Sequence, residues 1–505
     1  MKNIVTLTLL YISAPTYLFL YFWVKPGYAF LAISLIALTF SSILYNLYYK
    51  NNSVDESKEV PVNTIITSIL IAFGLCFFSE FGIYKYQSYD YLAHNYKFNL
   101  LTNTPLPLFD QEKGIYMCYY LGYYIIPSLL GSLTKLSLVK YFAFLWTWIG
   151  LTISYIWIQT TLSRFSLRGR IAICLLFTVG TYVCTIIPLI YEFIIQSENF
   201  KANSININNS FLYGQVSILS RGLSAAPQHI LPILLSFSFY LAIIKHLKFF
   251  YSYTFFLFCT LFWTPFAGIG MFVFYLYFVF CKIKEGKLFF LSRFIPYGVL
   301  LFISFSPVIL YFISSSASSL SSNRFVWQSA SNYWLMYYLL YIFTFLGVWF
   351  IFFNKYFFES NKVIIILSVI SFSLLGLGQI GYYNDFNLRS SAPSQLFLGF
   401  AISYGIVVNY KKLLFRSLLF TFGVLFFVLN TASFFKFHFD RLFILEHSQN
   451  SIEQPKVPWA DDNFYSVMEK GFLFGEDAVR QYSLKESGIF EKYLLKKSDG
   501  LLKPE

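Results

Sequence analysis

Charged residues are scarce in this sequence: they fill only 12% of its 505 positions, whereas hydrophobic residues fill 57%. Soluble domains carry about a quarter charged residues, so the composition excludes an ordinary soluble domain. Apolar runs of roughly 20 residues recur along the chain, and each could cross a hydrocarbon core of about 30 Å. A membrane β-barrel would instead show alternating segments of about 10 residues. The sequence therefore predicts an all-α polytopic membrane protein.

Cysteine is also scarce and forms no motif. The six cysteines stand singly, mostly within apolar runs, and none has metal-ligand or redox spacing. The net charge of +13 comes from basic residues scattered in twos and threes. No patch could follow a phosphate backbone, so we expect no nucleic-acid partner. Lys and Arg on cytoplasmic loops explain the charge more simply.

Polar breaks divide the apolar sequence into runs that predict about 13 transmembrane helices. The first run lacks a small-x-small cleavage site and is too long for a signal-peptide core, so we expect it to be retained. The segment Tyr116–Leu133 either spans the membrane or lies in its interface. The predicted spans are 3–24, 28–47, 63–84, 138–159, 171–192, 226–245, 250–264, 266–281, 290–312, 332–353, 363–379, 393–409 and 413–432.

These runs divide the chain into three parts. Residues 1–62 hold two transmembrane helices and a cytoplasmic loop. Residues 63–432 form the main transmembrane domain, with interfacial helices in a long loop at 85–137. Charge rises and apolar runs shorten over residues 433–505, which is too short to bury a generous core alone. We expect that segment to form a small cap on the outer face.

The distribution of Lys and Arg orients the second half of the chain. Whether or not Tyr116–Leu133 spans, the basic excess places three polar loops outside, around His229, Pro265 and Asp385. Only the side of the membrane on which Asp90 lies depends on whether Tyr116–Leu133 spans. If the long loop is also outside, polar groups from four segments open onto one face of the membrane.

The first of these polar groups is Asp90-x-x-x-His94. On a helix the two side chains lie one turn apart on one face, with Lys97 on the same stripe. A carboxylate that deprotonates a hydroxyl, with an imidazole to orient it, is a familiar acid–base arrangement. Ionisable residues beside a bilayer are costly to hold, which favours a functional role. A hydrogen-bonded i, i+4 pair on an interfacial helix is the structural alternative.

The second group, Gln228 and His229, follows Pro227 at the start of a span. His229 therefore lies in the first turn of a helix, where free N–H groups and the positive dipole end favour an anion such as a phosphate. A polar helix start with proline near its first position accounts for the same residues without a ligand.

The other two groups lie in the last third of the membrane domain. The segment Trp263–Phe266 divides an apolar stretch too long for one span, and its aromatic rings could contact a lipid chain or a sugar. A plain helical hairpin is the alternative. Arg389 offers a planar fork suited to phosphate, and Asp385, one turn earlier, either joins it in binding or only neutralises it.

Asp90 opens a long loop, the Tyr-rich run Tyr116–Leu133 follows, and a return span ends in Arg164–Arg170. This order of segments resembles that of the first half of GT-C glycosyltransferases. Those polytopic enzymes take sugars from polyprenyl-phosphate carriers. With the later polar groups, residues 63–410 are similar to a group of uncharacterised bacterial multispanning membrane proteins with a GT-C-like layout.

The resemblance implies that the loop 85–137 is extracytoplasmic and that Tyr116–Leu133 is interfacial. The N-terminus is then cytoplasmic and the C-terminus extracytoplasmic, in a bacterial cytoplasmic membrane. Asp90 matches the loop acid that acts as base on the acceptor, with His94 positioning the acceptor hydroxyl. Many members carry a second acid where this chain has Tyr91. We therefore assign no metal ligand, and a divalent metal cofactor stays open.

The expected function is transfer of a sugar from a polyprenyl-phosphate donor to an envelope glycan, lipid or protein acceptor. Membrane lipids are the remaining partner, and no soluble cofactor is needed. The residues expected to bind the substrate are Gln228, His229, Trp263, Asp385 and Arg389. Two alternatives stay open: a transporter or flippase for a lipid-linked or anionic solute, and a non-catalytic envelope assembly protein.

Overall fold

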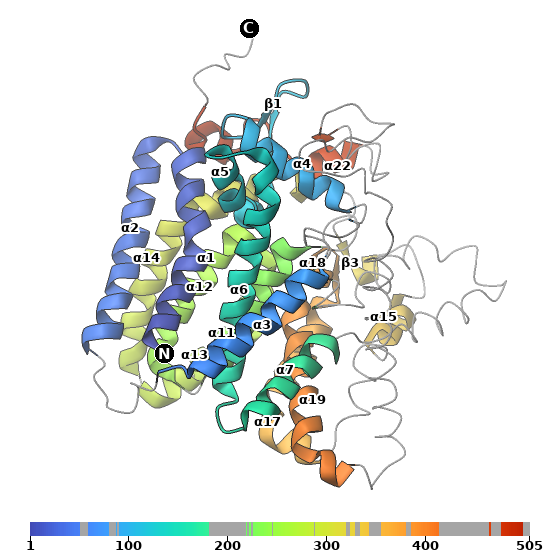
Figure 1. Ribbon diagram of the computed structural model, residues 1–505. Helices are drawn as coiled ribbons and strands as arrows, with labels where there is room; N and C mark the ends of the chain where they lie inside the picture. Colours follow the sequence, from blue (N-terminus) through green and yellow to red (C-terminus); the bar gives the residue numbers. More distant parts are fainter. Residues whose placement is uncertain are drawn as a thin grey trace, which may run out of the picture.

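A computed structural model describes most of the chain as a bundle of helices (Figure 1). In the described residues, six helical segments are long and apolar enough to cross a membrane, so the chain is a helical membrane protein. The described residues are 1–50, 59–79, 87, 90–180, 219, 222–223, 226–244, 246–286, 288–319, 324–328, 334–342, 355–379, 385–413, 464–465 and 476–497.

Most described residues of the predicted runs lie in helices. Each of the first twelve contains a described helix, and the thirteenth, 413–432, lies almost wholly outside the described residues. The count of 13 spans stays a prediction, because several of these helices are shorter than a full span. The helices are α1 (Lys2–Trp23), α2 (Pro26–Tyr45), α3 (Val62–Phe78), α6 (Val139–Thr161), α7 (Leu167–Gly180), α11 (Pro227–Ile243), α12 (Phe250–Trp263), α13 (Pro265–Gly286), α14 (Leu288–Ile313), α15 (Trp334–Ile342), α17 (Lys355–Leu375) and α19 (Ala392–Leu413).

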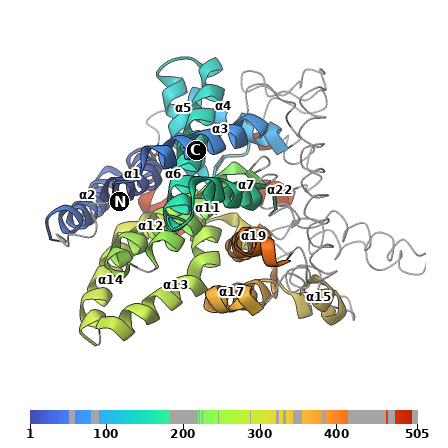
Figure 2. The ribbon, with the colours of Figure 1, turned by 60° about the horizontal axis from the view of Figure 1, so that its bottom comes forward.

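The core of the bundle surrounds α11, all of whose residues are buried. Helices α6, α12, α13 and α19 pack around it, and Figure 2 shows α11 in the middle of the bundle. The outward-facing rings and aliphatic chains of α2 and α14, such as Phe30 and Ile295, are exposed. Apolar surface of this kind is what a helix presents to lipid.

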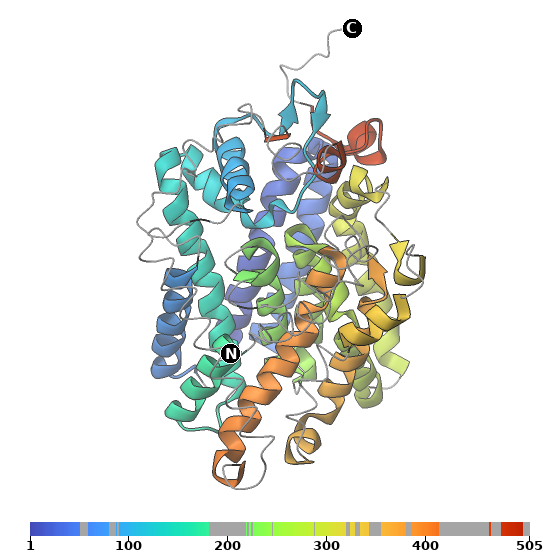
Figure 3. The same cartoon turned by 90° about the vertical axis from the view of Figure 1, so that its right-hand side faces the viewer.

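The run Tyr116–Leu133 does not form a spanning helix. It consists of the end of strand β2 (Ile115–Tyr116), the turn η3 (Leu121–Tyr123) and the short helix α5 (Ile125–Ser132). Eight helical residues extend only about 12 Å. These elements lie with α4 (Asp90–Asn103) at the end of the bundle where α1 ends, called the cap end below (Figures 1 and 3).

The C-terminal segment 476–497 joins the cap end through backbone hydrogen bonds. It contains α22 (Glu476–Gln481) and η11 (Phe490–Leu494). The N–H of Lys25, between α1 and α2, donates to Leu494 O at 2.8 Å. Further backbone bonds link this segment to the loop before α5 and to the end of α14, namely Leu484 to Tyr116, Cys118 to Tyr482 and Lys485 to Ser314. The segment therefore fixes three distant parts of the chain to one another.

The break between α12 and α13 lies where Pro265 predicts it. Helix α12 ends at Trp263, Thr264 is extended, and α13 begins at Pro265. Proline suits the first position of a helix, where its missing N–H costs nothing. Helices α12 and α13 pack on each other, which is the helical hairpin given above as the alternative for this segment.

Candidate functional site

The N-terminal turn of α11 holds two buried polar side chains. Gln228 and His229 are each only 2% exposed. His229 Nδ1 lies 2.9 Å from Thr264 Oγ1, so one of the two atoms donates to the other. Thr264 is the extended residue between α12 and α13, and the helix break therefore brings its hydroxyl to the imidazole.

Helix α4 contributes a second imidazole. His94 is buried, and its Nδ1 lies 2.5 Å from the hydroxyl of Tyr124, just before α5. Burial, with smaller contributions from neighbouring tyrosines, raises the pKa of Tyr124 well above its ordinary value. The phenol therefore stays neutral and can either donate to His94 or accept from it.

Lys97, one turn further along α4, is only 1% exposed and is surrounded by aromatic rings. Its ammonium nitrogen lies 4.0 Å from the centre of the Tyr119 ring and 5.4 Å from that of Tyr124. Phe464 and Tyr482, from the C-terminal part of the chain, lie at 5.9 and 5.5 Å. Cation–π attraction stabilises a cation in such surroundings. The cap end thus encloses a positive charge with rings from three separate segments.

Tyr119 and Tyr120 connect α4 with α11. Gln228 Nε2 donates to the hydroxyl of Tyr119 at 3.3 Å. The ring of Tyr120 meets His229 edge-on, with ring centres 5.0 Å apart. The other end of the amide, Gln228 Oε1, is buried and has no hydrogen-bond partner among the described residues. A buried polar atom left in this state is costly, and a bound ligand is one way to satisfy it.

Arg389 approaches from the opposite side of the site. It lies in the last turn of α18 (Asp385–Ser390), which packs on α13. A Cβ on Gly270 would overlap Ser390 O, so only glycine allows α18 to lie this close. The Phe386 ring contacts Phe266 at 6.3 Å between centres. This packing brings the guanidinium of Arg389 near His229, on which Arg389, Lys97 and His94 all act electrostatically.

The structure therefore brings four of the seven predicted site residues together: His94, Gln228, His229 and Arg389. The backbones of Asp90 and Asp385 begin α4 and α18, but their side chains lie outside the described part of the structure.

Trp263 has a different environment. Its indole is fully buried, donates from Nε1 to Ile12 O at 2.9 Å and stacks on Trp146. We assign it to the packing of α12 against α1 and α6.

Sequence reasoning gave no role to Lys97, Tyr119, Tyr120, Tyr124 or Thr264. Lys97 lay on the Asp90–His94 stripe, and the tyrosines belong to the conspicuous Tyr-rich run. No sequence signal joins the rings of Phe464 and Tyr482 to Lys97, because they lie more than 350 positions away. The four predicted residues and the five that were not predicted form what we call the basic cluster. Its members are His94, Lys97, Gln228, His229, Arg389, Tyr119, Tyr120, Tyr124 and Thr264.

The basic cluster has the chemistry of an anion site. Its ionisable side chains are cationic or neutral, and its hydroxyl and amide groups can donate hydrogen bonds. Among the described residues, no three His, Cys, Asp or Glu side chains are grouped to hold a metal ion.

Comparisons with known proteins found no relative of this chain. No family model, curated protein or solved structure matches the chain. The likeness to GT-C glycosyltransferases stays a prediction from the residues quoted above, and the proposal below depends on the chemistry of the basic cluster.

Proposed function

We propose that the chain is a GT-C-like integral membrane glycosyltransferase that uses a polyprenyl-phosphate-linked sugar as donor. The observation that carries the proposal is the buried first turn of α11, where Gln228 Oε1 has no hydrogen-bond partner among the described residues and where Lys97, Arg389 and His94 lie within electrostatic range of His229. A lipid-linked phosphate has the charge and size that such a group of donors would recognise. Since the site lies at one end of a bundle with lipid-facing helices, its ligand can belong to a lipid carrier.

In this proposal Asp90 removes the proton of the acceptor hydroxyl, whose oxygen then attacks the anomeric carbon of the donor sugar. The bond from that carbon to the phosphate oxygen breaks, and the phosphate leaves with the bonding electrons. Lys97, His229 and Arg389 stabilise the charge that develops on the leaving phosphate. His94, fixed by Tyr124, positions the acceptor hydroxyl.

The same proposal places the cap end outside a bacterial cytoplasmic membrane and the N-terminus in the cytoplasm. The acceptor is an envelope glycan, lipid or protein. Labelling of single cysteines substituted at Lys113 and at Arg168, both exposed, tests the orientation in intact cells. An impermeant reagent should label the first position and not the second, and the reverse result contradicts the proposed topology.

The activity is tested on the full chain in liposomes with a radiolabelled polyprenyl-phosphate sugar and an envelope extract as acceptor. We expect His229→Ala and Arg389→Gln to lower transfer about 100-fold each, the usual cost of one lost transition-state donor. His246→Ala is the matched control, because His246 is exposed beyond the other end of α11. A wild-type chain that moves the lipid across the bilayer without transferring its sugar would instead be a transporter.

A further inference from the structure

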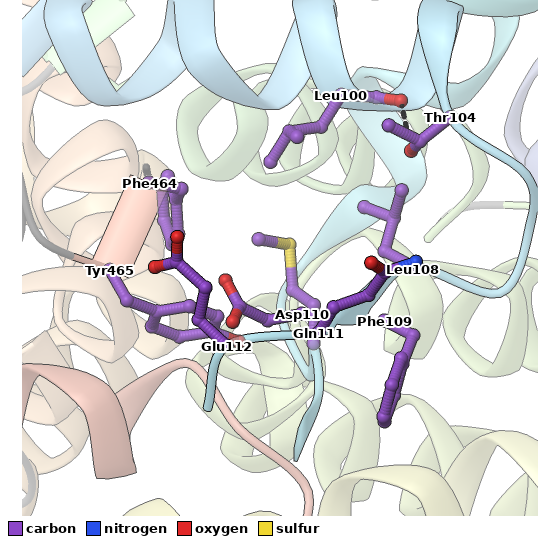
Figure 4. A pocket seen from close by; sticks show the side chains of 10 residues that line it. Leu100, Thr104, Leu108, Phe109, Asp110, Gln111, Glu112, Phe464 and Tyr465 are labelled. Atoms are coloured by element: carbon purple, nitrogen blue, oxygen red, sulfur yellow. Dashed lines mark hydrogen bonds between the residues drawn. The ribbon is translucent and has the colours of Figure 1, made fainter. Parts of the chain in front are cut away.

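A cavity lies at the cap end, outside the basic cluster. Its volume is about 390 Å³, within the range of about 300–1,000 Å³ that is usual for small-ligand sites. The end of helix α4, with Leu100, and Thr104 directly after it form one side of the cavity. The turn between β1 (Phe109–Asp110) and β2 forms the other side (Figure 4).

The walls of this cavity differ in chemistry. Phe464 and Tyr465, both buried, form an apolar wall beside Leu100. Asp110 and Glu112 stand on the β1–β2 turn, and Figure 4 shows both carboxylates pointing into the space between that turn and α4. One face of a ligand could therefore lie against rings while the other meets carboxylate oxygens.

The turn that carries the carboxylates is well defined. Asp110 Oδ1 accepts a hydrogen bond from the backbone N–H of Lys113 at 2.8 Å. Gly114 follows with a φ of 66°, a conformation that glycine adopts without strain. Asp110 is thus fixed by one oxygen, and its second oxygen can accept from a ligand.

The cavity and the basic cluster share a wall. The Phe464 ring lines the cavity and also lies 5.9 Å from the ammonium of Lys97. The Phe464 ring therefore stands between a molecule in the cavity and the ammonium of Lys97. This proximity makes the cavity a natural place for the molecule that receives the transferred group.

We infer that this cavity binds a hydrogen-bond-donating saccharide, and that it is the acceptor subsite. Carboxylates accept hydrogen bonds only, so the ligand must supply hydroxyl or ammonium donors. The apolar wall suits the C–H face of a sugar ring, and two carboxylates repel an acidic glycan. The role of the cavity as acceptor subsite depends on the proposed function, whereas the saccharide class depends on the cavity alone.

Binding of three tetrasaccharides to the full chain in nanodiscs, without donor lipid, tests the inference. The probes are the chitosan tetramer, which is cationic, maltotetraose, which is neutral, and tetragalacturonate, which is anionic. We expect the chitosan tetramer to bind most tightly, maltotetraose more weakly and tetragalacturonate not at all. The double variant Asp110→Asn/Glu112→Gln should lose affinity for the chitosan tetramer by about tenfold or more.

The variants are chosen to leave the fold intact. Asparagine retains an oxygen for the Lys113 N–H, and Lys135→Gln, exposed after α5 and outside the cavity lining, is the control that should bind as the wild type does. Equal affinity for tetragalacturonate, binding unchanged in the double variant, or no binding by any probe overturns the inference. If the wild-type chain binds the chitosan tetramer but transfers no sugar, the saccharide cavity is supported and the proposed function is wrong. Transfer unaffected by the double variant leaves the function and removes the subsite.

Discussion

Two polar clusters are buried in the bundle, and they satisfy their hydrogen bonds differently. The basic cluster lies at the cap end. The α3–α6 cluster, at the other end, consists of Thr64, Thr67, Ser68, Gln159 and Arg170. Gln159 donates from Nε2 to Ser68 at 2.9 Å and accepts at Oε1 from Thr67 at 3.0 Å. Gln228, in contrast, uses only its Nε2 among the described residues.

The difference separates packing from binding. In the α3–α6 cluster both ends of the Gln159 amide are bonded and Arg170 donates to Thr64 at 2.7 Å, although Arg170 Nε has no partner among the described residues. Such bonds hold helices together and need no ligand. The basic cluster gathers side chains from α4, α11 and α18, and its Gln228 Oε1 is buried without a hydrogen-bond partner among the described residues, as a ligand-binding group would be. We therefore expect the two clusters to respond in opposite ways to substitution.

Lys97→Met gives the largest expected effect. Transfer should fall about 100-fold, because one donor to the leaving phosphate is lost. Methionine has a similar length and fills the same aromatic enclosure, so we expect the variant to fold. The measurements are the liposome transfer assay and the melting temperature in detergent. Normal transfer by a folded Lys97→Met chain would place Lys97 with the structural residues.

Gly270→Ala should be next in size. A methyl group at Gly270 overlaps the backbone oxygen of Ser390, so α18 must shift and Arg389 with it. We expect a loss of about 1–3 kcal/mol in stability from overpacking, together with a clear drop in transfer. Gly268→Ala is the matched control on the same helix, because its nearest neighbour would be 3.8 Å away. Equal effects of the two substitutions would contradict the close approach of α18.

Gln159→Leu tests the α3–α6 cluster. Ser68 loses its partner, whereas Thr67 keeps its bond to Asn63 O at 2.7 Å, and we expect destabilisation of about 1–3 kcal/mol. Adding Ser68→Ala and Thr67→Val should restore most of that loss, since an apolar contact then replaces the polar one. Transfer per folded molecule should not change. A specific loss of transfer that the restored variant retains would show that this cluster also serves the reaction.

The sequence predicted the helices and the ends of the bundle where polar groups gather, because apolar runs and proline breaks are local signals. Pro265 is the clearest example, with α13 starting at that residue. The run Tyr116–Leu133 could not be decided, since its length is near that of a span and its breakers are few. Only tertiary structure turns it into a strand end, a turn and a short helix.

The site was predictable in its parts and not in its assembly. His229 and Arg389 stand out because polar residues at the ends of apolar runs are rare. Lys97 could not be recognised in this way, because the rings that enclose it belong to Tyr119 nearby and to Phe464 and Tyr482 far along the chain. Contacts across such separations leave no periodic trace in a single sequence.

The smallest effect compares two neighbouring tyrosines. Tyr124 bonds His94, whereas Tyr123 bonds Thr147 of α6 at 3.0 Å. Both hydroxyls are buried, so Tyr124→Phe and Tyr123→Phe should each cost about 1 kcal/mol of stability. Only Tyr124→Phe should also lower transfer, by a few-fold and with a changed pH profile, because His94 loses the group that orients it. Equal transfer by the two variants would reduce the His94–Tyr124 bond to packing and leave the basic cluster with one imidazole, that of His229.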